Sequence, residues 1–183
     1  MPYRRSHQED LCQALGLTPD FKYQKDGWQL PSYRALRELL DEHSPFPGLD
    51  RLAAAQAAVF HFLVGNADAH AKNISLLHVR DGVRLAPLYD VVSTLVYPEL
   101  STELALSIGD ELSPDAITQI HWSDLAEDFG LNQRSFERTR RELRDRVALE
   151  ASRLRNEAHA AGWHHPCIDT ILEIVADRSS RVV

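Results

Sequence analysis

Apolar and polar positions recur at helical spacing along most of the chain, which predicts a mainly α fold. The longest run of this kind is Ala-rich, covers residues 49–64, and reads as a buried helix that leads directly into Gly65. Asn132 is placed to cap a long helix that ends near Ala161, before Gly162. The other expected helices are residues 7–17, residues 31–40, two helices that start at Ser113 and Ser123, and residues 168–175.

One stretch departs from helical spacing and predicts a small β-hairpin. Residues 74–79 are apolar and β-prone, Asp81-Gly82 is a strong turn signal, and residues 83–86 read as the returning strand. No repeat, low-complexity tract or linker divides the sequence. Residues 1–183 are therefore expected to form one domain, mainly α with a small β-hairpin.

Length, charge and cysteine content narrow the class of protein. A chain of 183 residues can bury a sizeable core, and a net charge of -7 argues against a nucleic-acid binder that works by bulk electrostatics. Cys12 and Cys167 are too far apart for a disulfide framework. No apolar stretch is long enough to cross a bilayer, and Met1–Asp10 lacks an apolar signal core. We therefore expect a reduced, cytoplasmic protein without a membrane partner.

Candidate chemistry lies on both sides of the predicted hairpin. The run Gly65–Asn73 reads Gly-Asn-Ala-Asp-Ala-His-Ala-Lys-Asn, and Ala86–Asp90 follows the hairpin. Because the loops before and after a hairpin can open at the same end, we expect Asp68, Asn73 and Asp90 to lie together. The interval from Asp68 to Asn73 equals that of a protein-kinase catalytic loop, and a second Asp beyond a hairpin completes that layout.

These three side chains suit the needs of phosphoryl transfer. In that reaction a carboxylate accepts the proton of the attacking hydroxyl, and oxygen ligands hold the Mg²⁺ ions that bridge the phosphates of ATP. Asp68 is the candidate base, and Asn73 and Asp90 are the candidate metal ligands. In many such loops a lysine stands two residues after the base. Here His70 takes that place and Lys72 lies beside Asn73, so either could touch the transferred phosphate.

The block Gly-Asn-x-Asp-x-His-x-Lys-Asn, followed by Ala-Pro-Leu-Tyr-Asp-Val-Val-Ser-Thr, resembles the C-terminal domain of HipA-type toxin kinases. The segments His7–Gly16, Lys22-Tyr23 and Leu104–Gly109 also resemble that family, so the similarity runs from about Ser6 to Leu131. The resemblance implies a protein-kinase-like C-lobe and a serine/threonine protein kinase, the toxin of a bacterial toxin–antitoxin module. Such proteins are held by a helix-turn-helix antitoxin, through which they reach DNA only indirectly. They phosphorylate a target of the translation machinery, often an aminoacyl-tRNA synthetase.

The resemblance also implies roles for single residues, beginning with Asp68 as the catalytic base. The residues that it places on the nucleotide, metal and phosphates are His70, Ala71, Lys72, Asn73, Tyr89 and Asp90. One departure is visible, because the family often has Gly-Gly-Pro after the Lys-Tyr element, whereas Gly27–Pro31 reads Gly-Trp-Gln-Leu-Pro. That difference puts the local backbone path in question, and not the catalytic residues.

The sequence lacks the parts that cover the phosphates in a kinase. Its eight glycines form neither a Gly-x-Gly-x-x-Gly loop nor a Walker loop, and Lys22, Lys25 and Lys72 are not on a strand resembling Val-Ala-Ile-Lys. In HipA-type kinases those parts lie in an N-terminal region that would precede Met1. We therefore expect a C-lobe alone, with little or no turnover by itself. It could be cut from a longer kinase, be a separately encoded C-lobe that joins an N-lobe partner, or be a repurposed remnant.

Two other functions remain open at this level. The lobe could be a non-catalytic interaction module that binds an antitoxin or an N-lobe partner. It could also be a metal-dependent hydrolase, because Asp68, His70 and Asp90 are plausible ligands with His61 and His78 nearby. The latter two lie in an apolar helix and on a strand, which favours packing or surface roles.

Two further patterns can each be interpreted either as an ordinary structural feature or as a binding site. His164-His165 with Cys167 could bind zinc, but a second spaced pair is missing and a turn is favoured. The run Arg134–Arg155 holds eight arginines and four acids and could contact operator DNA or an antitoxin. A solvated helix face is favoured, with i,i+4 pairs such as Glu137–Arg141 and Glu142–Arg146.

Overall fold

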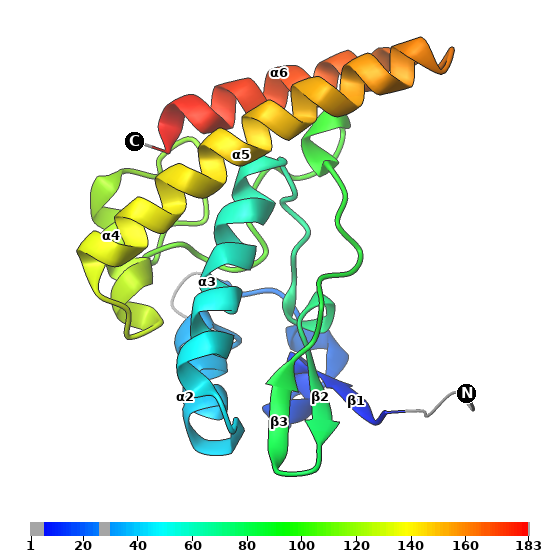
Figure 1. The fold of residues 1–183 in the computed structure, drawn as a ribbon. Helices are drawn as coiled ribbons and strands as arrows, with labels where there is room; N and C mark the ends of the chain where they lie inside the picture. Colours follow the sequence, from blue (N-terminus) through cyan, green and yellow to red (C-terminus); the bar gives the residue numbers. More distant parts are fainter. Residues whose placement is uncertain (1–5, 26–29, 183) are drawn as a thin grey trace.

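The computed structural model of the chain describes residues 6–25 and 30–182, and Figure 1 shows a mostly helical molecule with one small sheet. The prediction of a mainly α fold with a small β element is confirmed. The helices are α1 (Leu11–Ala14), α2 (Tyr33–His43), α3 (Pro47–Leu63), α4 (Gln119–Asp128), α5 (Gln133–Ala160) and α6 (Pro166–Arg181). Short 3₁₀ turns cover Pro19–Phe21, Ala71–Asn73 and Thr94–Val96. Residues 27–29, which carry the departure from the family pattern, lie outside the described residues.

The sheet has three antiparallel strands in the order β1 (Gln8–Asp10), β2 (Ser75–Val79) and β3 (Gly82–Leu85). The predicted hairpin is confirmed as β2–β3, and its turn lies one residue earlier than expected because Val79 pairs with Gly82. The expected helix over residues 7–17 is wrong at its start, where β1 pairs with β2. A few apolar positions cannot separate strand from helix, and pairing with a distant strand decides between them.

Helix α3 runs through the centre of the molecule and buries a stripe of small residues. Ala54, Ala55 and Ala58 are nearly inaccessible to solvent, and α2 and α5 pack against this helix. Phe62 near its end meets Trp122 of α4 edge to face, with ring centroids 5.1 Å apart. The end of α3, from which the candidate catalytic loop starts, is therefore fixed from several sides.

Helices α5 and α6 form an antiparallel pair that crosses the end of α3 (Figure 1). The predicted cap is confirmed, because Asn132 accepts a hydrogen bond from the Ser135 N–H, and Gly162 follows the last turn with a φ of 84°. Within the described part of the chain, no helix is long and apolar enough to span a bilayer.

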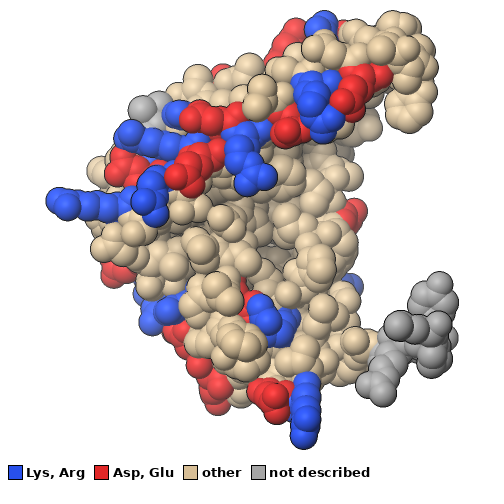
Figure 2. All heavy atoms as spheres, in the orientation of Figure 1, with Lys and Arg blue, Asp and Glu red and all other residues tan. Residues whose placement is uncertain are grey.

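The exposed side of α5 carries positive and negative side chains in alternation (Figure 2). Glu137 pairs with Arg141 as expected, whereas Glu142 lies 3.8 Å from Arg138 and forms no described pair with Arg146. These intrahelical pairs favour the interpretation of this arginine-rich run as a solvated helix face.

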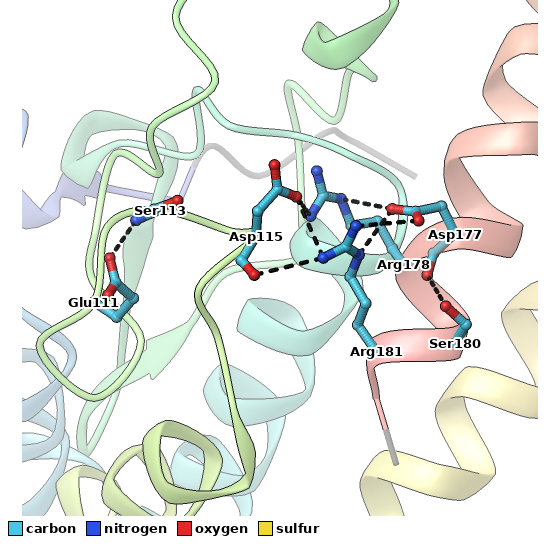
Figure 3. Close-up of polar contacts among 7 residues, drawn as sticks. All are labelled: Glu111, Ser113, Asp115, Asp177, Arg178, Ser180 and Arg181. Carbon is cyan, nitrogen blue, oxygen red and sulfur yellow. Dashed lines mark hydrogen bonds and ion pairs between the residues drawn. The ribbon is translucent and has the colours of Figure 1, made fainter.

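The end of α6 is tied to the loop before α4 by an arginine–aspartate cluster (Figure 3). Arg178 donates to Asp115 over 2.8 Å and lies over the Phe62 ring, while Arg181 pairs with Asp177. The helix starts expected at Ser113 and Ser123 are wrong, because residues 114–116 form a turn and α4 begins at Gln119. The turn that carries Asp115 is held by an arginine more than sixty residues further along the chain.

The hairpin approaches the end of α2 so closely at position 82 that a glycine is required there. Its φ is 139°, and an added Cβ would lie 2.1 Å from the carbonyl oxygen of His43. We predict that Gly82→Ala lowers the free energy of unfolding by roughly 2–4 kcal/mol, through backbone strain and this contact. Urea unfolding of the variant measures the loss.

The control is Gly48→Ala, because a Cβ at Gly48 meets no atom of the described residues within 4 Å. Position 48 lies in the first turn of α3, where alanine is the better helix former, so stability should stay the same or rise by up to about 1 kcal/mol. Equal unfolding curves for the two variants would contradict the account of the hairpin contact.

A buried histidine in α3 is expected to make stability depend on pH. His61 is 6% exposed, and burial lowers its pKa from 6.5 to about 4. Between these values the unfolded chain binds the proton and the folded chain does not, so stability falls as the pH falls. We predict that His61 alone accounts for a loss of about 3 kcal/mol across this window.

Urea unfolding at several pH values tests this prediction. His61→Gln should remove this part of the pH dependence, whereas His164→Gln, at an exposed position, should keep it. An unchanged pH dependence in His61→Gln would show that this histidine is not held neutral by burial.

Candidate active site

The loop that carries Asp68 begins where α3 ends, and its path requires a glycine. Gly65 has a φ of 69°, and an added Cβ would lie 2.5 Å from the Ile174 side chain of α6. Thr94 then fixes the loop, since its hydroxyl accepts from the Ala67 N–H over 2.8 Å and donates to the Gly65 carbonyl over 3.3 Å. The start of the loop is thereby joined to α6 and to the 3₁₀ turn at Thr94.

The rest of the loop folds back so that Asn73 returns to Asp68. The Asp68 carbonyl accepts hydrogen bonds from the His70 N–H over 2.8 Å and from the Asn73 side-chain amide over 3.1 Å. The 3₁₀ turn Ala71–Asn73 closes this path. The five-residue interval noted in the sequence therefore becomes a direct contact, and the predicted base and the predicted metal ligand are neighbours.

The Asn66 side chain connects the loop to both its flanks. Its Oδ1 accepts from the Asp68 N–H over 3.1 Å, which leaves Nδ2 to donate to Nδ1 of His61 over 3.1 Å. The same Nδ2 lies 3.5 Å from the Asp90 carbonyl oxygen. Asn66 is 2% exposed, so α3, the Asp68 loop and the segment after the hairpin meet at one buried amide.

Residue Asp90 follows the hairpin in an unusual backbone conformation. Its φ is 53°, in the left-handed region, and its side chain is exposed. Asp68 and Asp90 both lie near enough to His70 to raise its pKa, against burial and the Lys22 ammonium, which together lower it below its ordinary value. The predicted base and the second aspartate are therefore both near His70, although the three side chains are not grouped closely enough to hold a metal ion between them.

Tyr89 joins the segment after the hairpin to the loop before it. Its hydroxyl donates to the Lys72 carbonyl over 2.6 Å and accepts from the Ser75 hydroxyl over 2.6 Å. Ala71 is fully buried, and its N–H donates to the Lys22 carbonyl over 3.0 Å. Both residues hold the loop in shape, and the nucleotide contacts expected of them stay predictions.

The oxygen atoms available at the site suit a hard cation. The Asn73 amide nitrogen is engaged with Asp68, which leaves Oδ1 free of described hydrogen bonds, and the Asp90 carboxylate forms no ion pair with a described residue. Magnesium is commonly held by one or two such oxygens, with substrate phosphates and water completing the shell. Asn73 and Asp90 therefore fit Mg²⁺.

The described residues form no metal site built from protein ligands alone. Among the described residues, no three or more His, Cys, Asp or Glu side chains are grouped so that they could hold a metal ion. His165 instead accepts from the Cys167 N–H at the start of α6, and His78 pairs with Glu9. Neither the hydrolase interpretation nor the zinc interpretation gains support.

Several residues of the site were not assigned a role from the sequence. Asn66, Thr94 and Tyr23 act through hydrogen bonds to partners that lie apart in the chain. Asn66, Thr94 and Lys22-Tyr23 all lie in segments that resemble the kinase family, and this was the signal available for them. The contacts themselves depend on the tertiary fold.

Comparisons with known proteins identify the family of this chain. Residues 2–151 match the family described as HipA-like C-terminal domain. Y4mE of Sinorhizobium fredii, named as a candidate kinase, is 36% identical over 178 residues, covering 97% of this chain and 42% of Y4mE. The serine/threonine-protein kinase toxin HipA of Shewanella oneidensis is 32% identical over 135 residues, covering 69% of this chain and 31% of the toxin.

A chain of the solved complex of Shewanella oneidensis HipA, HipB and operator DNA has a TM-score of 0.76 to this structure at 26% identity. The match covers 97% of this chain and 42% of that one. The chain thus spans less than half the length of the relatives it matches. With a family match over most of its residues and a fold in common with HipA, the chain belongs to the HipA-like C-terminal domain family.

Proposed function

We propose that this chain is the C-terminal catalytic lobe of a serine/threonine protein kinase and the toxin of a toxin–antitoxin system. The lobe would support transfer of the γ-phosphoryl group of ATP to a protein Ser or Thr hydroxyl, with Mg²⁺ present. The observation that carries the proposal is that the buried Asn66 amide contacts the backbone of both Asp68 and Asp90, while Asn73 donates to the Asp68 carbonyl. Kinase-named relatives in the same family support it.

In the proposed reaction, Asp68 accepts the proton of the acceptor hydroxyl. The acceptor oxygen bonds to the γ-phosphorus as the bond from that phosphorus to the bridging oxygen breaks, and ADP leaves with that oxygen. Magnesium, held by Asn73 and Asp90, would supply neutralising charge for the phosphates. This division of roles needs little covalent chemistry from the protein, and positioning does most of the catalysis.

The loop His70–Asn73 would face the nucleotide. The lowered pKa of His70 keeps its ring uncharged at neutral pH, and its buried Nδ1 has no hydrogen-bond partner among the described residues. A neutral ring can donate its N–H to a phosphate oxygen, whereas Lys72 would offer charge. The buried Ala71 would hold the turn between them.

The binding partners that we propose for this chain follow from its relatives in the HipA-like family. The Shewanella oneidensis complex contains HipA, HipB and operator DNA, which supports an antitoxin as partner and DNA contact through it. A separate N-lobe would supply the phosphate-covering loop that residues 1–183 lack. A protein substrate such as an aminoacyl-tRNA synthetase and a cytoplasmic location complete the proposal.

One observation favours a second candidate, a non-catalytic interaction module. Large apolar side chains within residues 88–100 are exposed on the segment after the hairpin, and exposed apolar surface of this kind is typical of a region covered by another protein. The residues are Leu88, Val91, Val92, Tyr97 and Leu100. Both candidate functions include an N-lobe or antitoxin as partner, so partner binding does not distinguish them. Nucleotide binding does, because only the kinase proposal requires it.

A thermal shift with Mg-ATP tests the kinase proposal. Nucleotide at 100 times its dissociation constant adds about 2.7 kcal/mol, which should raise the Tm by roughly 5–10 °C. Asp90→Asn should abolish most of this shift, because the metal loses its carboxylate. Asparagine tolerates the left-handed backbone at this position, so the variant should keep the fold.

The matched control is Asp81→Asn in the hairpin turn, where asparagine is equally suitable and the side chain is exposed. It should show the full shift. A wild-type chain without any shift at saturating Mg-ATP would contradict the kinase proposal for this lobe and favour the interaction module.

A further inference from the structure

The segment Lys22–Gln24 lies against the candidate catalytic loop, although it precedes that loop by more than forty residues. The Lys22 carbonyl accepts from the Ala71 N–H over 3.0 Å, and the Gln24 N–H donates to the Ala105 carbonyl over 2.9 Å. Ala105 in turn donates to the Ala67 carbonyl over 2.9 Å. Backbone hydrogen bonds on both sides therefore place this segment at the loop, independently of the Lys22 and Tyr23 side chains.

The Tyr23 hydroxyl donates to Oδ1 of Asp68 over 2.8 Å. Its ring also meets the His70 ring edge to face, with centroids 5.4 Å apart. Burial and the bond to Asp68 raise the pKa of Tyr23, so the phenol stays protonated and remains a donor at physiological pH. One oxygen of the predicted base is thereby held, and the other accepts no hydrogen bond from the described residues.

The Lys22 ammonium lies 4.8 Å from the centroid of the Tyr23 ring. It is also near enough to His70 to lower the pKa of that ring. Lys22 and Lys72 form no ion pair with any described residue, whereas arginines elsewhere, such as Arg84 and Arg178, are paired with carboxylates. In a chain of net charge -7, cations left without carboxylate partners beside a predicted phosphate site are available for an anion.

We propose that Lys22 is a phosphate-binding residue of this active centre and that Tyr23 is a positioning residue for Asp68. The inference rests on the proposed kinase function. Lys22 supplies, from a separate segment, the positive charge that many kinase loops place two residues after the base, where His70 stands here. Its ammonium stabilises negative charge on the γ-phosphoryl oxygens, while Tyr23 holds Oδ1 of Asp68 so that Oδ2 faces the acceptor hydroxyl.

Calorimetric titration of the chain with Mg-ATP and with Mg-ADP tests the role of Lys22. Lys22→Met keeps the backbone bond to Ala71 and should weaken Mg-ATP binding about tenfold, with a smaller effect on Mg-ADP. Lys22→Arg should restore most of the affinity. Arg146→Met, which removes an exposed charge from α5, is the control and should bind both nucleotides as the wild type does.

The outcomes separate this inference from the proposed function. Equal Mg-ATP affinities of Lys22→Met and Arg146→Met would overturn the role of Lys22 and leave the kinase proposal standing. An equal loss for ATP and ADP would overturn its assignment to the transferred group. A wild-type chain that binds neither nucleotide would contradict the proposed function and, with it, this inference.

A pH titration followed by the NMR chemical shifts of the tyrosine ring carbons tests the role of Tyr23. Asp68→Asn removes the negative acceptor, so the pKa of Tyr23 should fall, which a purely packed tyrosine would not show. Tyr23→Phe keeps the ring against His70 and should retain the wild-type affinity for Mg-ATP, since it alters the base and not the phosphate contacts. An unchanged Tyr23 titration in Asp68→Asn would overturn the positioning role.

Discussion

The buried side chain of Asn66 is the contact on which the candidate active site depends. One amide group joins α3 through His61, the Asp68 loop through a backbone N–H, and the segment after the hairpin through the Asp90 carbonyl. Because Asn66 is almost inaccessible to solvent, its own amide would be a buried unsatisfied group without these partners, at a cost of about 1–3 kcal/mol. This cost keeps the two aspartates in a fixed relation.

The remainder of the fold serves to hold the three elements that meet at Asn66. The end of α3 is packed between α5, α6 and α4, and Gly65 allows α6 to approach the start of the loop. Tyr89 and the Lys22–Gln24 segment then fasten the loop from two other directions. Helices thus form a rigid frame on one side of the site. On the other side the segment after the hairpin exposes apolar side chains, which suits a lobe that works against another protein surface.

Local signals in the sequence identified the elements that local chemistry determines. Asn132 and Gly162 bounded α5 correctly, and the β-prone residues on either side of Asp81-Gly82 indicated the hairpin. The interval from Asp68 to Asn73 predicted their contact because both lie in one short loop. The strand Gln8–Asp10 was missed because it exists only by pairing with β2. The roles of Asn66, Thr94 and Tyr23 were missed for the same reason, since their partners come together only in the tertiary fold.

The proposed phosphoryl transfer requires Asn73 and Asp90 to hold a metal ion together. A crystal of the chain grown with Mn²⁺ and a non-hydrolysable ATP analogue, measured for anomalous scattering, tests it most directly. We expect a manganese peak about 2.1 Å from the Asn73 Oδ1 and from an Asp90 carboxylate oxygen, with phosphate oxygens completing the shell. Bound nucleotide with manganese at other residues, or no nucleotide in the crystal, would contradict it.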